Sequence, residues 1–209
     1  KLEFGVRADR LSTDPADGHG RDFSPLSVSL GGSYRIDEHW HLSLNLDRAQ
    51  RAAAEEELFA DGPHVATNAF EIGDPDLRRE TANQAELGLH FHSDRVEARI
   101  AAYANRFDDY IYLLDTGEFE DDLAVRQWTQ ADAKFHGFEG EAKFTVAEIA
   151  SGRYDLRIWG DTVKARLADG GKLPRIAPAR IGIDFGWSAD AWRARIGATR
   201  YFRQDDVTE

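Results

Sequence analysis

Strict alternation between apolar and polar residues is the feature that most restricts how this chain can fold. In residues 40–47 every even position is apolar and every odd position is polar, in the run Trp-His-Leu-Ser-Leu-Asn-Leu-Asp. The same period of two returns in further stretches, at 87–92, 96–102, 138–146, 154–158, 181–187 and 192–199. Because neighbouring residues of a strand point to opposite faces, each stretch predicts a β-strand with one apolar and one polar face.

Read with its turn signals, the alternation predicts an all-β chain, an antiparallel up-and-down meander of about nine strands. The expected strands lie near residues 1–9, 25–36, 39–48, 83–93, 95–107, 125–146, 153–164, 178–188 and 191–203. They are joined by tight or short turns at 37–38, 93–94, 147–152 and 189–190, and by long loops at 10–24, 49–82, 108–124 and 165–177. Short turns at one end and long loops at the other are typical of outer-membrane β-barrels, whose short turns are periplasmic.

Composition is compatible with such a barrel and excludes other classes. No apolar run approaches the roughly 20 residues of a transmembrane helix, but only every second residue of a barrel strand faces lipid, so mean hydropathy stays low. The formal net charge of −12 argues against binding of nucleic acid, which needs a basic face. Cysteine is absent, which excludes disulfide bonds and thiolate metal sites.

Three tryptophans flank the expected short turns on the apolar parity. Trp40, Trp187 and Trp192 lie where an interfacial girdle is expected, because an indole ring is apolar and carries one polar N–H. In this orientation the apolar faces contact lipid and the polar faces line a lumen. A soluble β-sandwich or ligand-binding barrel would instead bury the apolar faces, and this alternative stays open on the alternation alone.

One segment departs from the strand pattern. Residues 52–60 read Ala-Ala-Ala-Glu-Glu-Glu-Leu-Phe-Ala, a run rich in helix formers, and Gly62-Pro63 follows as a helix-ending pair. We therefore expect one short helix inside the long loop 49–82.

Residues 48–88 resemble the late barrel region of TonB-dependent outer-membrane receptors. That region has an arginine, a helix ending in Glu-Leu, a glycine, a Gly-x-Pro-x-Leu-x-x-Glu segment and a Glu-x-Gly that opens the next strand. The matching residues here are Arg51, Glu57-Leu58, Gly62, Gly73-Asp74-Pro75-Asp76-Leu77, Glu80 and Glu86-Leu87-Gly88. Weaker matches follow at 103–111, 137–141 and 174–180, and Ala52 departs from the family, whose members often carry proline there.

The resemblance implies an outer-membrane receptor for active uptake of a scarce solute, and not an enzyme. Such barrels have about 22 strands around a plug, so residues 1–209 are expected to be an open, partial barrel domain without the plug domain and the terminal strands. The implied partners are outer-membrane lipid, the receptor's own plug domain, the TonB energising complex acting through the missing N-terminal part, and the transported solute, with no role for nucleic acid. The cargo class is a metal ion such as zinc or a metal–siderophore chelate, and no cofactor is required.

The loop from Asp61 to Asp74 is similar to that of zinc-uptake members of this family. His64, Asp61, Glu71 and Asp74 offer the nitrogen and oxygen ligands that suit Zn²⁺, with His64 as the central candidate. Zinc would then be a transported ligand. Receptors for other solutes can share this loop, and the plain alternative is that His64 is a solvated surface side chain.

A second group of candidates is predicted from strand geometry. His41, His90 and His92 lie on the polar parity of strands 39–48 and 83–93, which should pair antiparallel around the long loop. Cross-strand neighbours lie about 5 Å apart, so these imidazoles can share a metal or form a relay in the lumen. The alternative is a wet, polar lumen wall that contacts the plug.

A small outer-membrane enzyme is the remaining alternative. The sequence contains no nucleophile elbow, P-loop or His-Glu-x-x-His helix. The carboxylate pairs Asp108-Asp109 and Asp121-Asp122 fall in expected long loops and fit solvated acidic loops better than acid–base catalysis. The residues therefore favour the receptor.

Overall fold

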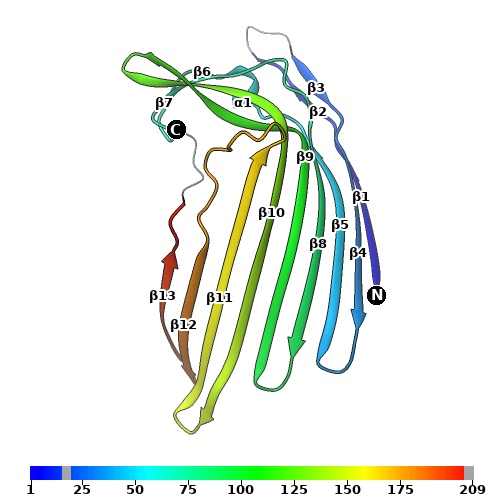
Figure 1. Ribbon diagram of the computed structural model, residues 1–209, viewed down its shortest axis with the longest axis vertical. Coiled ribbons are helices and arrows are strands. Elements are labelled where there is room, and N and C mark those ends of the chain that lie inside the picture. The colour runs from blue at the N-terminus through cyan, green and yellow to red at the C-terminus, as the bar shows by residue number, and fades with distance from the viewer. Residues whose placement is uncertain (16–19, 205–209) are drawn as a thin grey trace.

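The computed structural model describes residues 1–15 and 20–204 and contains one large, open antiparallel sheet (Figure 1). Its nine main strands follow one another in chain order, each paired with the next. They are β1 (Leu2–Ala8), β4 (Leu26–Arg35), β5 (Trp40–Arg51), β8 (Glu80–His92), β9 (Val96–Glu120), β10 (Leu123–Ile149), β11 (Gly152–Leu167), β12 (Arg180–Ala189) and β13 (Trp192–Tyr201). The predicted all-β meander of about nine strands is confirmed.

Short turns join the strands at the lower end of Figure 1 and long connections join them at the upper end. In the turn between β4 and β5, the Asp37 carboxylate accepts the backbone N–H groups of His39 and Trp40, each at 2.8 Å. These two hydrogen bonds lower the pKa of Asp37 below its usual value, and the one from His39 has the larger effect. In the turn between β12 and β13, Asp190 has a φ of 43°, which aspartate tolerates in tight turns. The expected alternation of short and long connections is present except between β9 and β10, which residues 121–122 join in a tight turn.

The long connections contain more regular structure than the sequence predicted. The stretch 10–24 includes a small hairpin of β2 (Leu11–Thr13) and β3 (Arg21–Phe23), with residues 16–19 outside the described part. The stretch 49–82 contains α1 (Glu55–Phe59), β6 (Asp61–His64) and β7 (Ala69–Ile72). The expected helix is therefore present, but it ends at Phe59, and Gly62-Pro63 belongs to β6 instead of ending the helix.

The expected loop 108–124 is wrong, because β9 and β10 continue as a paired ribbon to Glu120 and Leu123. The register shifts between Ala131 and Ala133 and again between Ala124 and Arg126. Each irregularity changes which residues face which side, so the alternation that revealed the lower strands is lost above them. The ribbon also pairs in parallel with β7, so β6, β7, β10 and β9 form a smaller sheet among the long loops.

The apolar face of the large sheet is exposed along its length. Phe4 is 88% exposed, Leu87 51%, Ile183 48% and Trp192 74%. The buried hydrophobic residues gather elsewhere, in two clusters near the long connections. A soluble sandwich would bury this face, so the soluble alternative is wrong. In the described part of the chain, no helix is long and apolar enough to cross a membrane.

Candidate functional site

Arg51, at the loop end of β5, binds two glutamates of the long connection through one guanidinium group. Its Nε and Nη2 atoms lie 3.1 and 3.2 Å from the Glu80 carboxylate, and its Nη1 donates to Glu57 Oε2 at 2.8 Å. Each carboxylate also accepts a backbone N–H, Glu57 from Ala54 at 2.8 Å and Glu80 from Ile111 at 2.9 Å. The arginine and the two glutamates of the family motif thus bind β5, α1, β8 and β9 together.

The leucines of the same motif pack beneath this ion pair. Leu58 of α1 is 1% exposed and Leu77, just before β8, is 0% exposed, and they form a cluster with Phe23, Ala53 and Ile111. Arg21 of β3 donates to the Leu77 carbonyl at 2.9 Å. Arg51, Glu57, Leu58, Leu77 and Glu80 therefore form one packed unit, which we call the platform. In the chain, β6 and β7 lie between its two leucines.

Gly73 is required by the close approach of the chain to α1. A Cβ added there would lie 2.6 Å from the Leu58 carbonyl carbon and 2.7 Å from the Ala60 nitrogen, which are backbone atoms that cannot rotate away. We expect Gly73→Ala to lower the free energy of unfolding by about 1–3 kcal/mol, the usual effect of overpacking. Urea unfolding of the receptor would measure this loss.

Gly117→Ala is the matched control for conformational strain alone, because Gly117 has a φ of 75° and nothing lies within 4 Å of its added Cβ. An equal loss in both variants would contradict the steric argument.

His64 ends β6 beside a buried carboxylate. Glu71 of β7 is 3% exposed, and its Oε1 accepts the Thr67 hydroxyl at 2.6 Å. The Trp128 indole N–H of β10 donates to Glu71 Oε2 at 3.2 Å. His64 Nδ1 lies 3.4 Å from Glu71 Oε1 and 3.3 Å from the Thr67 hydroxyl, while its side chain stays about half exposed. The opposite ring nitrogen, Nε2, is therefore the one left for a ligand.

The four zinc candidates are only partly brought together. His64 and Glu71 are in contact, whereas the Asp74 carboxylate accepts the backbone N–H of Asp76 at 2.8 Å in its own turn. Asp61 is exposed at the start of β6. Within residues 1–15 and 20–204, no three His, Asp or Glu side chains are grouped as metal ligands would be. Thr67 and Trp128, which hold Glu71, were not among the predicted residues. Trp128 belongs to β10, which only the fold brings to this loop.

The histidines on the polar face are also only partly assembled. His41 and His90 are direct register partners, and their rings stack at a centroid distance of 4.4 Å and an angle of 6°. The Ser43 hydroxyl lies 3.1 Å from His90 Nε2. His92 is not part of this stack. It lies 3.7 Å from Glu97, and its carbonyl lies 3.0 Å from His39 Nδ1. His39, a turn residue, was not among the predicted candidates.

Ion pairs between strands cover the rest of the polar face. Arg99 of β9 lies 2.8 Å from Glu139 of β10 and 3.5 Å from Glu86 of β8. The same arrangement recurs in Arg157 with Glu141 and Asp184, and in Arg180 with Asp161. These residues share the polar parity of paired strands, so the register would have revealed them if it had been known. The resulting wall is charged, which suits a water-filled lumen.

Comparison with known proteins identifies the fold. The family model described as TonB dependent receptor-like, beta-barrel matches residues 1–209. The chain belongs to this family. It is a receptor barrel segment of the bacterial outer membrane and not an enzyme. In such a barrel the exposed apolar face contacts lipid and the polar face lines the lumen. The open sheet agrees with the expectation of a partial barrel.

Individual proteins give the same picture. The heme/hemopexin utilization protein C of Haemophilus influenzae (strain 86-028NP) is 25% identical over 95% of this chain and 30% of its own length. The solved copper transporter OprC superposes over 100% of this chain and 34% of its own, with a TM-score of 0.78 and 18% identity. The siderophore receptor PirA from Acinetobacter baumannii covers 96% and 31%, with a TM-score of 0.64 and 17% identity. The chain thus spans about a third of these proteins, and the two structures show the fold.

Proposed function

We propose that this chain supplies part of the wall and several extracellular loops of a receptor that takes up a metal ion, with zinc as the cargo, or alternatively a metal chelate. The observation that carries the proposal is the pair of His64 and buried Glu71 on a platform fixed by Arg51. A metal-binding histidine commonly donates its other ring N–H to a carboxylate, which fixes the tautomer and the ring orientation. Similar proteins named for heme, iron or copper support a metal-related cargo.

In this proposal His64 binds zinc through Nε2, and Glu71 orients the ring from behind. Asp61 and Asp74 lie on the same loop, and movement of the loop would bring them to the metal. We also propose that residues 1–209 are one part of a larger barrel domain. The receptor's own plug domain would lie inside the lumen, and the TonB complex would act on that plug.

Zinc titration of the complete receptor tests the site. We expect His64→Ala to weaken zinc binding at least about tenfold, and Glu71→Gln to weaken it about 10- to 100-fold, the usual effect of losing an orienting carboxylate. His39→Ala is the matched control, because His39 is an exposed histidine of the short turn between β4 and β5, at the other end of the strands from this loop. Isothermal titration calorimetry gives the three affinities. Zinc affinity that is unchanged in His64→Ala removes zinc from the proposal and leaves a metal chelate as the cargo.

The stacked pair His41 and His90 is a second proposed position on the route of the metal. It lies on the lumen wall near the short turns, whereas His64 lies among the long loops. The double substitution His41→Gln and His90→Gln is expected to slow zinc uptake by cells, while zinc binding at His64 stays unchanged. An unchanged uptake rate would assign the pair to the plain alternative, a polar wall that contacts the plug.

A further inference from the structure

The charged side chains of the large sheet are divided between its two faces. Below the level of Arg106, the acidic residues of the strands face the lumen, and several of them pair there with arginines as described above. Among described outward-facing positions, from the short turns up to the level of Arg106, there is no Asp or Glu. The outward face does carry basic residues, and they gather at one end of the strands.

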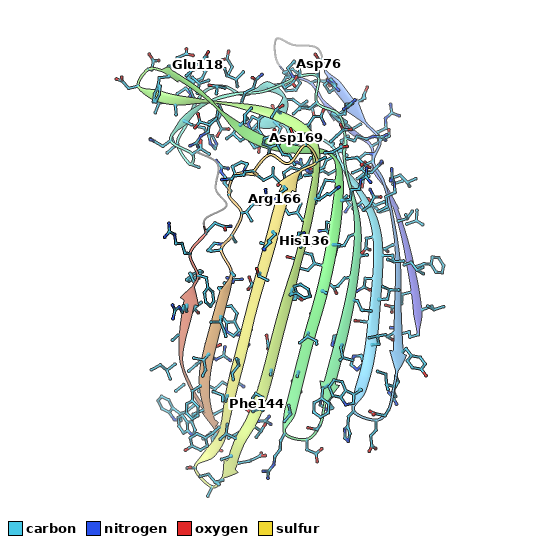
Figure 2. The ribbon with its side chains drawn as sticks, in the orientation of Figure 1. Asp76, Glu118, His136, Phe144, Arg166 and Asp169 are labelled. Carbon is cyan, nitrogen blue, oxygen red and sulfur yellow. The ribbon has the colours of Figure 1, made fainter. Side chains whose placement is uncertain are left out.

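The basic residues form a belt across β9, β10 and β11. Arg106 is the register partner of Lys134, and Lys134 is the partner of Arg166. One rung closer to the apolar band, His136 faces Lys164. All five side chains are exposed, and partners on neighbouring strands lie about 5 Å apart. Figure 2 shows His136 and Arg166 near the loop end of the sheet and Phe144 near the short turns.

The belt borders directly on the lipid-facing surface. The outward positions below it include Phe138, which is 63% exposed, and Ile100, which is 60% exposed. Long basic side chains at such a border lay their methylene groups along apolar surface and extend the charge into the headgroup region. A partner that neutralises this belt therefore lies in the plane of the membrane, and its headgroup is anionic.

The two ends of the strands differ in chemistry. At the short turns, the outward face carries aromatic residues, with Trp40 tilted against Phe91 at a centroid distance of 4.8 Å and Trp192 at the start of β13. At the long loops it carries the basic belt. Short turns are periplasmic and long loops are extracellular in such barrels, so the belt lies at the outer leaflet. That leaflet differs from the inner one by its phosphorylated glycolipid.

Two lysines of the belt lack a carboxylate partner among the described residues. Arg106 Nε lies 3.8 Å from Asp108, which is one rung closer to the loops. Among the described residues, no carboxylate forms an ion pair with Lys134 or Lys164. Phosphate groups on the glycolipid would supply the missing negative charge, and both arginine and lysine bind phosphate well.

We propose that the belt of Arg106, Lys134, His136, Lys164 and Arg166 binds the phosphate groups of a phosphorylated, acylated glycolipid of the lipid A type. The acyl chains would lie on the apolar band that contains Phe138 and Ile100. Bound glycolipid would hold β9, β10 and β11 at a fixed depth in the membrane. These strands support the platform and the ribbon of the ligand-binding loops, so glycolipid binding would fix the level of those loops too.

Native mass spectrometry of the complete receptor in detergent tests this site. The probes are bis-phosphorylated lipid A, the same lipid without phosphates, phosphatidylglycerol and phosphatidylethanolamine. The variant combines Arg106→Gln, Lys134→Gln and Lys164→Gln. We expect it to retain bis-phosphorylated lipid A at least about tenfold less than the wild type, because each basic residue contributes separately to binding of an anionic lipid. The wild type should prefer bis-phosphorylated lipid A over the other three probes.

A matched control removes the same charge from the lumen face, through Lys143→Gln, Arg193→Gln and Arg195→Gln. These positions have the opposite parity, so the control should retain lipid A like the wild type. The shift of gel mobility on heating shows whether each variant is folded. Equal retention of lipid A by the belt variant and the wild type would overturn the proposal, and so would equal retention of phosphatidylglycerol or of lipid A without phosphates.

Discussion

Replacing Arg51 with alanine is expected to destabilise the loop platform by about 3 kcal/mol while the strands below it stay paired. The Glu57 and Glu80 side chains are each about 10% exposed, and both would keep a charge with no cation to neutralise it. Breaking a buried ion pair from one side costs about 3–5 kcal/mol. The lower end applies here because the Arg51 side chain is itself 42% exposed.

Hydrogen exchange on the complete receptor measures this effect locally. Faster exchange is expected in α1 and at the Ile111 amide, which donates to Glu80 at 2.9 Å. Arg7→Ala is the matched control, since Arg7 also pairs with a carboxylate at 2.8 Å, that of Asp9, but its side chain is 78% exposed. Exposed pairs contribute about 0–1 kcal/mol. Equal changes in hydrogen exchange in the two variants would show that Arg51 does not stabilise the platform.

The platform also shows which parts of the structure could be predicted from the sequence. The strands below the loops follow from alternation, because one face meets lipid and the other meets water over their whole length. The motif residues Arg51, Glu57 and Glu80 were found only through a resemblance to a family. Their separation in the chain does not reveal that one guanidinium binds both carboxylates, since that contact needs the loop to fold back on β5.

The loops could be predicted least. The continuation of β9 and β10 was missed because bulges shift the parity, and Asp109 takes a φ of 59° at one of them. The parallel pairing of β7 with β10 joins residues far apart in the chain, and no local pattern encodes it. For this reason Glu71 was expected as an open ligand, whereas the fold buries it against Trp128 and leaves His64 exposed.

The second large expected effect tests the orientation of the sheet, because an added arginine should destabilise the barrel on the lipid-facing side and not on the lumen side. Leu44 lies midway along β5, between the aromatic end at Trp40 and the level of Arg48, and its side chain faces lipid. An arginine at the middle of the bilayer destabilises a barrel by about 2–4 kcal/mol. We therefore expect Leu44→Arg to lower the free energy of unfolding by this amount, measured by urea titration of the complete receptor in lipid vesicles.

The neighbouring position separates orientation from the general cost of an added charge. Asn45 faces the lumen, where its amide donates to Glu86 at 3.4 Å. An arginine there would meet water and the Glu86 carboxylate, so Asn45→Arg should change the free energy of unfolding by less than about 1 kcal/mol, as an exposed ion pair does. The two substitutions add the same side chain one residue apart in the same strand. A larger loss in Asn45→Arg than in Leu44→Arg would mean that the apolar face is the one that packs inside, which a barrel wall in lipid does not allow.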